Sequence, residues 1–224
     1  MSEFDEYTYD WMDPYGSLST LHAINPVRLS FLQSVCNLND TLDVLDLGCG
    51  GGIFTFYLDQ HHPSLNITGI DSAKKAIHFA KKHAENQKRK IQFTDQSALK
   101  PFNKTFDIIV CFELIEHLSN PNSLIENIRK HLKPNGYLAL STIDRTMMSF
   151  IQNIVIAEHV LEIVPRGTHS YKDFIRPNEL IEIAKKHNLQ PTLMNGLYID
   201  PITYTFEKTD DIKSNYFVAF QNQV

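Results

Sequence analysis

Three residues with metal-binding or acid–base side chains stand close together in the middle of the chain. Glu113, Glu116 and His117 occur in ELIEH, which directly follows the apolar stretch FDIIVCF. If a helix starts here, the three residues share one face at positions i, i+3 and i+4. They could then bind a divalent cation, Mg²⁺ or Mn²⁺ through oxygen ligands, or Zn²⁺ or Fe²⁺ if the histidine dominates. Without a metal, His117 is a candidate general base.

A glycine-rich loop is the second chemical feature. VLDLGCGGG (Val44–Gly52) leads from a strand-like segment into a helix-like one. Gly48 permits a tight turn, and Gly50 and Gly52 leave room for a ligand. A dinucleotide-binding loop of the form GxGxxG needs glycine at position 53, where this chain has Ile53. The form GxGxG after an aspartate is typical instead of the class I fold that binds S-adenosylmethionine.

Acidic residues end or follow the next two strand-like segments. Asp71 ends NITGID, and a carboxylate there can accept hydrogen bonds from both hydroxyls of a ribose. Asp95 follows IQFT, where it either meets an adenine amino group or serves as a helix cap or loop acid. Strand, loop, helix, strand and terminal acid in this order indicate a nucleoside ligand. A nicotinamide cofactor and a turn without a ligand are the alternatives.

A parallel sheet would bring these residues together. Apolar strand-like segments alternate with helix-like ones, as in βαβ units. The expected strands are 43–47, 66–71, 91–94, 106–112 and 137–142, with two late strands near 193–198 and 216–221. The sequence therefore predicts an α/β fold: a Rossmann-like, doubly wound, mostly parallel sheet of seven strands, with its candidate site at the carboxyl ends of the strands.

Length and composition restrict the class of protein. A chain of 224 residues suits one α/β domain, 1–224. A net charge of −5 without a concentrated basic face argues against a nucleic-acid partner. No stretch looks like a signal peptide, a transit peptide or a membrane span. The three cysteines form no CxxC pair, so reduced thiols in a cytoplasm-like compartment are expected.

Two segments lie outside the alternation of strands and helices. Residues 1–40 are expected to form an N-terminal helical cap, and residues 146–175 an insertion after the fifth strand. An insertion at that edge usually builds the substrate side of a site. Within 147–164, apolar residues recur at helical spacing and predict an amphipathic helix. They are Met147, Phe150, Ile154, Ala157, Leu161 and Val164.

The sequence resembles the ubiquinone-biosynthesis O-methyltransferases, class I enzymes that methylate polyprenyl catechols, from about Trp11 to Gln223. The motifs that carry the resemblance are WMDPYG, LHAINPVRL, VLDLGCGGG, ELIEHLSNP, LSTIDR, VPRGTH, FIRPNEL, GLYIDPIT and NYFVAFQN. The resemblance implies transfer of a methyl group from S-adenosylmethionine to 3-polyprenylbenzene-1,2-diol and to 3-demethylubiquinol. It also implies a class I methyltransferase fold.

The resemblance also implies roles for individual positions. Positions that bind the methyl donor in the family correspond here to Arg28, Gly48, Asp71 and Phe112. Phe112 replaces a methionine frequent in the family, and still suits an apolar wall against adenine. The proposed ligands of the family's divalent metal, Mg²⁺ first among the candidates, correspond to Glu113, Glu116 and His117. Thr20 and Asp144 replace a usual proline and asparagine, and the Asp144 change leaves the exact substrate open.

A polyprenyl substrate lies in a bilayer, so the implied function predicts contact with a membrane surface through 147–164. Arg145 and Arg166 flank that helix and could meet anionic headgroups, whereas Glu158 and Glu162 oppose such binding. An ordinary helix packed on its own domain is the alternative. The expected location is cytoplasmic, with peripheral contact at the inner membrane. Other enzymes of quinone biosynthesis are candidate partners.

Two other functions fit the same features. One is an O-methyltransferase for a different small phenol or quinol. The other is a non-catalytic subunit that binds the donor and organises a quinone-synthesis complex.

Overall fold

The strands of the structure, a computed structural model, lie in one sheet. The structure describes residues 11–144, 174–200, 203, 205–212 and 214–223. The strands are β1 (Asp43–Leu47), β2 (Asn66–Asp71), β3 (Gln92–Asp95), β4 (Phe106–Phe112), β5 (Leu132–Ile143), β6 (Leu189–Ile199), β7 (Phe206–Thr209) and β8 (Asn215–Asn222). Their order in the sheet is β3-β2-β1-β4-β5-β8-β6-β7. The helix predicted over 147–164 lies outside the described residues.

The first five strands run parallel and form the centre of the sheet. All residues of β4 except Asp107 are buried, as expected for a parallel strand covered on both faces. Side chains alternate between the faces. Val44 of β1 joins the hydrophobic core on one side, and Leu45 joins the core on the other.

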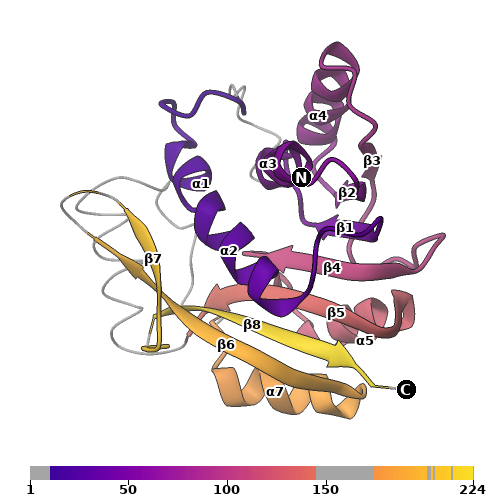
Figure 1. Ribbon diagram of the computed structural model, residues 1–224. Helices are drawn as coiled ribbons and strands as arrows, with labels where there is room; N and C mark the ends of the chain where they lie inside the picture. The colour runs from indigo at the N-terminus through magenta and orange to yellow at the C-terminus, as the bar shows by residue number, and fades with distance from the viewer. Residues whose placement is uncertain (1–10, 145–173, 201–202, 204, 213, 224) are drawn as a thin grey trace.

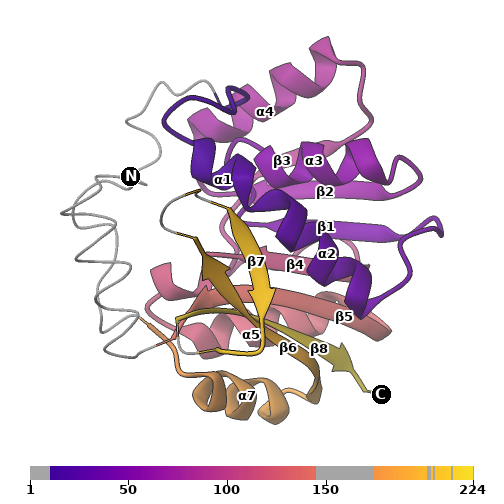
Figure 2. The same ribbon diagram turned by 60° about the vertical axis from the view of Figure 1, so that its left-hand side comes forward.

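Helices cover both faces of the sheet (Figures 1 and 2). The helices are α1 (Ser19–Ala23), α2 (Asn25–Val35), α3 (Ile53–His61), α4 (Lys74–Asn86), α5 (Pro121–His131) and α7 (Pro177–Lys186). Helices α2 and α3 pack on one face, where Phe31 and Leu58 are fully buried. Helices α5 and α7 pack on the other face through Ile125 and Leu180. The predicted α/β class with a mostly parallel sheet is confirmed.

The sheet has one strand more than the sequence predicted. The prediction of seven strands missed β7, which pairs antiparallel with β6 and forms the edge of the sheet. Its sequence FEKT is short and polar, so it carries no apolar alternation. Lys208 of β7 donates hydrogen bonds from Nζ to Ser30 O (3.3 Å) and Ser34 Oγ (3.1 Å) of α2. Contacts distant in sequence therefore hold this strand.

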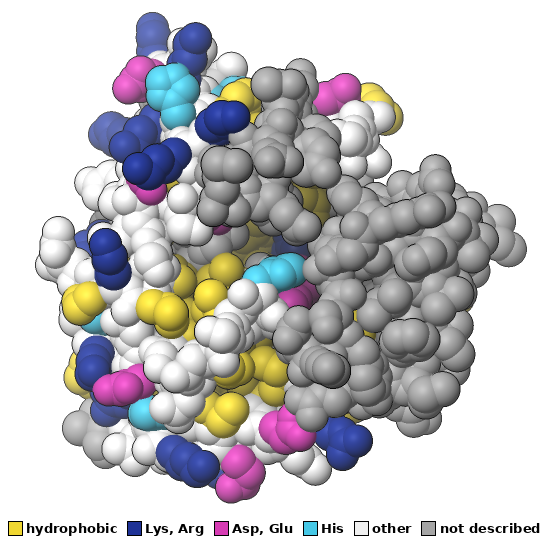
Figure 3. Space-filling model, turned by 180° about the vertical axis from the view of Figure 1, so that it is seen from behind, with side chains coloured by type: hydrophobic (Ala, Val, Ile, Leu, Met, Phe, Trp, Pro, Cys, Tyr) yellow, Lys and Arg dark blue, Asp and Glu magenta, His cyan; other side chains and the backbone are white. Residues whose placement is uncertain are grey.

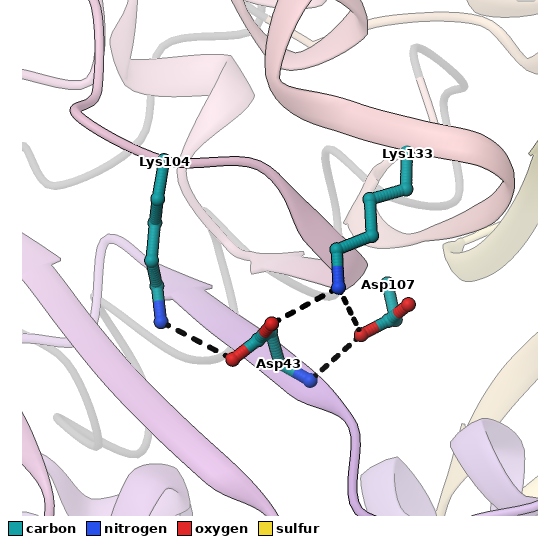
Figure 4. A network of polar contacts seen from close by, with 4 residues as sticks. All are labelled: Asp43, Lys104, Asp107 and Lys133. Carbon is teal, nitrogen blue, oxygen red and sulfur yellow. Dashed lines mark hydrogen bonds and ion pairs between the residues drawn. The ribbon is translucent and has the colours of Figure 1, made fainter.

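A polar network joins the amino ends of β1, β4 and β5 (Figure 4). Lys133 Nζ lies 3.0 Å from Asp43 Oδ2 and 2.8 Å from Asp107 Oδ2. Asp107 Oδ2 also accepts a hydrogen bond from the Asp43 N–H (2.8 Å), and Lys104 Nζ lies 3.4 Å from Asp43 Oδ1. The hydrogen bonds to Asp107 and Asp43 raise the pKa of Lys133. This network is at the opposite edge from the glycine loop.

Replacing Lys133 with methionine is expected to destabilise the fold without affecting any chemistry at the other edge. Because the groups are partly exposed, the free energy of unfolding should fall by only about 1 kcal/mol. Urea unfolding at low and high salt would measure this, and the difference between wild type and variant should shrink at high salt. Lys130→Met, which removes an exposed pair with Glu126 on α5, is the matched control. An equal loss in both variants would contradict a special role for the network.

Candidate active site

The candidate site residues meet where the order of the strands reverses. From β1 the chain continues to β2 and β3 on one side, whereas β4 and β5 lie on the other. Ligands of open α/β sheets bind at the carboxyl ends of the strands at such a point. The glycine loop follows β1, Asp71 ends β2, and Glu113 follows β4. The structure therefore brings these three parts of the sequence to one edge.

The glycine loop has a backbone that few other residues could adopt. Gly48, Gly50 and Gly52 have φ angles of +84°, +53° and +88°. This is the left-handed region, which side chains with a Cβ rarely enter. The N–H groups of Gly48 and Cys49 donate to Ile70 O, at 2.7 Å and 3.2 Å, and tie the loop to β2. The loop is thus anchored before any ligand binds.

Asp71 stands beside this loop with both carboxylate oxygens oriented. Oδ2 accepts a hydrogen bond from the Gly50 N–H (2.8 Å), and Oδ1 accepts one from the Ala73 N–H (2.7 Å). Each carboxylate oxygen has a second lone pair, so Asp71 can also accept from a ligand hydroxyl. Asp95 pairs with Asp71 in the register of β3 and β2 and is exposed. Both acids lie at the edge where the sequence placed them.

Arg28 and Phe112 form a buried pair on the other side of the loop. The guanidinium of Arg28 lies 5.4 Å from the centre of the Phe112 ring, and Arg28 is 6% exposed. The Phe112 ring also packs edge-on against Phe54 and Phe217. The structure therefore gives Phe112 a role in supporting Arg28. Its contact with an adenine ring stays a prediction.

Three carboxylates share the positive charge of Arg28. Burial lowers the pKa of Arg28, and the charges of Glu113, Asp46 and Glu116 oppose that shift. Burial raises the pKa of Glu116 to about 8, and the charge of Glu113 adds to this rise. Burial likewise raises the pKa of Asp46 to about 6, although a hydrogen bond from Thr55 and the charge of Arg28 act against it. One cation therefore faces three acids, and burial favours the protonated form of both Glu116 and Asp46.

The predicted helix start at Glu113 is wrong. Glu113 has a left-handed backbone, φ +53°, and Ile115–His117 form a single 3-10 turn. The next α-helix starts only at Pro121, where the Asn120 side chain accepts a hydrogen bond from the Ser123 N–H. The spacing i, i+3, i+4 therefore does not place the three side chains on one helical face. Glu116 is buried and His117 is exposed.

The arrangement of these residues does not fit a metal site. Across 11–144 and the described parts of 174–223, the structure contains no group of three His, Cys, Asp or Glu side chains that could hold a metal ion. Glu116 Oε2 instead accepts a hydrogen bond from Thr142 Oγ1 (2.9 Å), and the Glu113 carboxylate accepts one from Ser141 Oγ. Both hydroxyls come from the end of β5. The two carboxylates are therefore held as hydrogen-bond acceptors.

Sequence reasoning missed these hydroxyl residues. Ser141 and Thr142 are buried at the end of β5, and Thr55 of α3 donates from Oγ1 to Asp46 Oδ2 (2.5 Å). The polar pair Ser-Thr at the end of the apolar strand YLALST was the available signal. A buried hydroxyl needs a hydrogen-bond partner, and Glu113 directly follows the neighbouring strand β4.

Asp46→Asn is expected to flatten the pH dependence of stability between about pH 4 and pH 6. The native-state pKa of about 6 lies above the ordinary 3.8, so the native state keeps a proton that the unfolded chain releases. This contribution to stability is complete below pH 4 and is lost as pH rises through 6, amounting to about 3 kcal/mol. Urea unfolding at several pH values would measure it. Asp40→Asn, at an exposed position, should keep the wild-type slope; an unchanged slope in Asp46→Asn would contradict the assignment.

The surface of the protein has a hollow that combines apolar and ionisable side chains. In the view from behind, the hollow lies near the centre of the face, with hydrophobic side chains to its left and below it (Figure 3). A histidine and acidic side chains lie at its rim (Figure 3). Such a lining can accept an aromatic ring and still offer a group that takes a proton.

The sequence is similar to those of known methyltransferases over most of its length. Residues 22–193 match the family model described as "Methyltransferase domain". The chain is 36% identical to the ubiquinone biosynthesis O-methyltransferase of Coxiella burnetii (strain RSA 331 / Henzerling II), covering 100% of this chain and 95% of the relative. It is also 36% identical to the protein of the same name from Actinobacillus pleuropneumoniae serotype 7, covering 99% of this chain and 97% of the relative.

Solved structures share the fold at low sequence identity. PH0226 protein from Pyrococcus horikoshii OT3 superposes with a TM-score of 0.69 at 17% identity, covering 100% of both chains. Magnesium protoporphyrin IX methyltransferase from Synechocystis PCC 6803, solved with bound SAH (S-adenosylhomocysteine), superposes with a TM-score of 0.64 at 14% identity. In that comparison, 92% of this chain and 84% of the other are covered.

Proposed function

Because the chain belongs to the family of ubiquinone biosynthesis O-methyltransferases, we propose that it transfers a methyl group from S-adenosylmethionine to a phenolic oxygen of a polyprenyl catechol or quinol. The whole chain, 1–224, would serve as one catalytic domain. The observation that carries the proposal is that the loop expected to bind the donor and the candidate bases meet at one sheet edge. The chain that forms this edge of the sheet also matches a ubiquinone biosynthesis O-methyltransferase over its full length.

The donor would lie across the ends of β1 and β2. Asp71 would accept hydrogen bonds from its ribose hydroxyls, because backbone N–H groups already orient both carboxylate oxygens. Arg28 would bind its carboxylate; the Nε of Arg28 is buried and makes no hydrogen bond within the described structure. Gly48, Gly50 and Gly52 would let the loop backbone approach it, Asp95 would meet the adenine amino group, and the Phe112 ring would support Arg28.

The donor supplies a methyl group on a positively charged sulfur, which is displaced in line by a phenolate oxygen. The protein then has to position the phenol and remove its proton, since a phenol has an ordinary pKa of about 10. His117 is the proposed general base because its side chain is exposed, whereas that of the neighbouring Glu116 is buried. Hydrogen bonds from Ser141 and Thr142 would hold the Glu113 and Glu116 carboxyl groups in place beside it.

The resemblance to the family also raises the question whether Glu113, Glu116 and His117 bind a divalent metal. In the described residues these side chains do not gather as ligands, so no step of the proposed reaction passes through a metal. Methyl transfer measured with and without a chelator would show whether the reaction depends on Mg²⁺.

Access to a prenylated substrate requires contact with a bilayer. None of the helices that the structure describes could cross a membrane. We propose peripheral contact through 147–164, which rests on the apolar spacing in the sequence, and a cytoplasmic location at the inner membrane. Other enzymes of quinone biosynthesis would be neighbours on that surface.

The test is transfer of a labelled methyl group to a short-tailed prenyl catechol, with and without a chelator. Transfer that resists the chelator would support the proposal with His117 as base. Transfer lost with the chelator and restored by Mg²⁺ would support the enzyme and overturn the metal-free mechanism. Equal rates on a tail-less catechol would favour another small phenol or quinol as substrate. Donor binding without transfer to any phenol would favour the non-catalytic subunit.

A further inference from the structure

The single tryptophan of the chain lies directly on the glycine loop. A Cβ on Gly51 would overlap the indole of Trp11, and a Cβ on Gly50 would lie 3.1 Å from it. Gly51, unlike its neighbours Gly50 and Gly52, does not have a left-handed backbone. Its lack of a side chain is therefore explained by the close approach of Trp11. The indole is 5% exposed, so this contact is buried.

The same tryptophan also reaches the second wall of the proposed donor site. Trp11 forms a small hydrophobic cluster with Ile53, Ala73 and Ala76. Ile53 begins α3 after the glycine loop, and Ala73 directly precedes α4 after β2. Asp71 connects these two walls, because its carboxylate accepts from the N–H groups of both Gly50 and Ala73. Trp11 therefore packs over the link that would hold the ribose.

A hydrogen bond anchors the segment that carries Trp11. His22 Nε2 of α1 donates to Trp11 O (2.9 Å), and Leu18 and Leu21 pack against the cluster. The segment before α1 lies on the same side of the sheet as α3 and α4 in both ribbon views (Figures 1 and 2). The tryptophan is thus also held by residues that follow it in the chain, and these are not part of the glycine loop.

We propose that Trp11 is a positioning residue for the methyl donor, which it serves by holding the glycine loop in its binding conformation; this rests on the proposed function. Four of the five residues from Gly48 to Gly52 are glycine, so an unsupported loop samples many conformations. Ordering them on binding would reduce affinity. With the indole packed on Gly50 and Gly51, that ordering is complete before the donor arrives.

The test compares Trp11→Ala, Trp11→Phe, Gly51→Ala and the double variant Trp11→Ala/Gly51→Ala by calorimetric titration with S-adenosylhomocysteine. Trp11→Ala and Gly51→Ala should each weaken binding about tenfold, and Trp11→Phe less. The double variant should also be about tenfold weaker, because Gly51→Ala acts only by displacing the indole. The KM for the donor should rise while kcat at saturating donor stays unchanged. Tyr15→Ala, at an aromatic position of the same segment that is 93% exposed, is the control.

Two results would overturn the proposal. One is wild-type affinity in a folded Trp11→Ala or Gly51→Ala variant, with folding checked by thermal unfolding. The other is a loss of about a hundredfold in the double variant, since additive effects would mean that Gly51 acts independently of Trp11. If the wild type itself fails to bind S-adenosylhomocysteine, the proposed function fails. If the wild type binds and the variants match it, only the role of Trp11 fails.

Discussion

Replacing Arg28 with leucine is expected to reduce donor affinity by about a hundredfold or more and to destabilise the protein by on the order of 3 kcal/mol. Arg28 is buried, and its charge faces Asp46, Glu113 and Glu116. Without it, the three acids lose their common positive neighbour, and the pKa values of Asp46 and Glu116 should rise further. The donor would also lose the proposed partner of its carboxylate.

Titration with S-adenosylhomocysteine and urea unfolding separate the two effects of this substitution. Compared with Arg28→Leu, Arg28→Lys should recover much of the stability because it keeps the positive charge. It should recover little of the donor affinity, because lysine lacks the planar guanidinium that can donate two parallel hydrogen bonds to a carboxylate. The control is Arg89→Ala, which removes a partly exposed ion pair with Asp59 and should leave the affinity unchanged. Normal donor binding by a folded Arg28→Leu variant would remove Arg28 from the donor site.

Replacing His117 with alanine is expected to lower kcat by about a thousandfold and to leave donor affinity unchanged. The reason is that the proposed general base is lost while the loop and Asp71 stay intact. Single-turnover methyl transfer at saturating donor would measure the effect on the chemical step.

His61→Ala is the matched control for this second prediction. His61 is exposed near the end of α3, and its Nδ1 contacts Tyr57 O within the same helix. A full rate in His117→Ala together with a large loss in Glu113→Gln would instead assign the base to Glu113. Glu113 is the nearest alternative because its left-handed backbone, φ +53°, marks a strained position at this edge.

The parallel half of the fold could be predicted because most of its strands are buried on both faces. A run such as FDIIVCF admits few other environments, and the order of strand, glycine loop, helix and acid placed Asp71 and the loop correctly. Strand β7 could not be predicted in this way. FEKT has little apolar character, and its place depends on pairing with β6 and on the contact of Lys208 with α2.

The local structure around Glu113 shows a different limit of sequence reasoning. Helical spacing in ELIEH suggested one face, yet Asn120 and Pro121 were the real start of the helix. An asparagine cap followed by proline at the first position is a stronger signal than spacing over five residues. The partners Ser141 and Thr142 lie on another strand, so only the register of β4 and β5 could bring them to the acids.

The position of Trp11 also has a spectroscopic consequence. Because the chain has no second tryptophan, its indole emission comes from one place, the surface of the glycine loop. Indole emission depends on the polarity and rigidity of the surroundings. Fluorescence excited selectively at tryptophan should therefore report the conformation of this loop in the unlabelled protein. Rapid mixing would then follow the arrival of a ligand in real time, without any added dye.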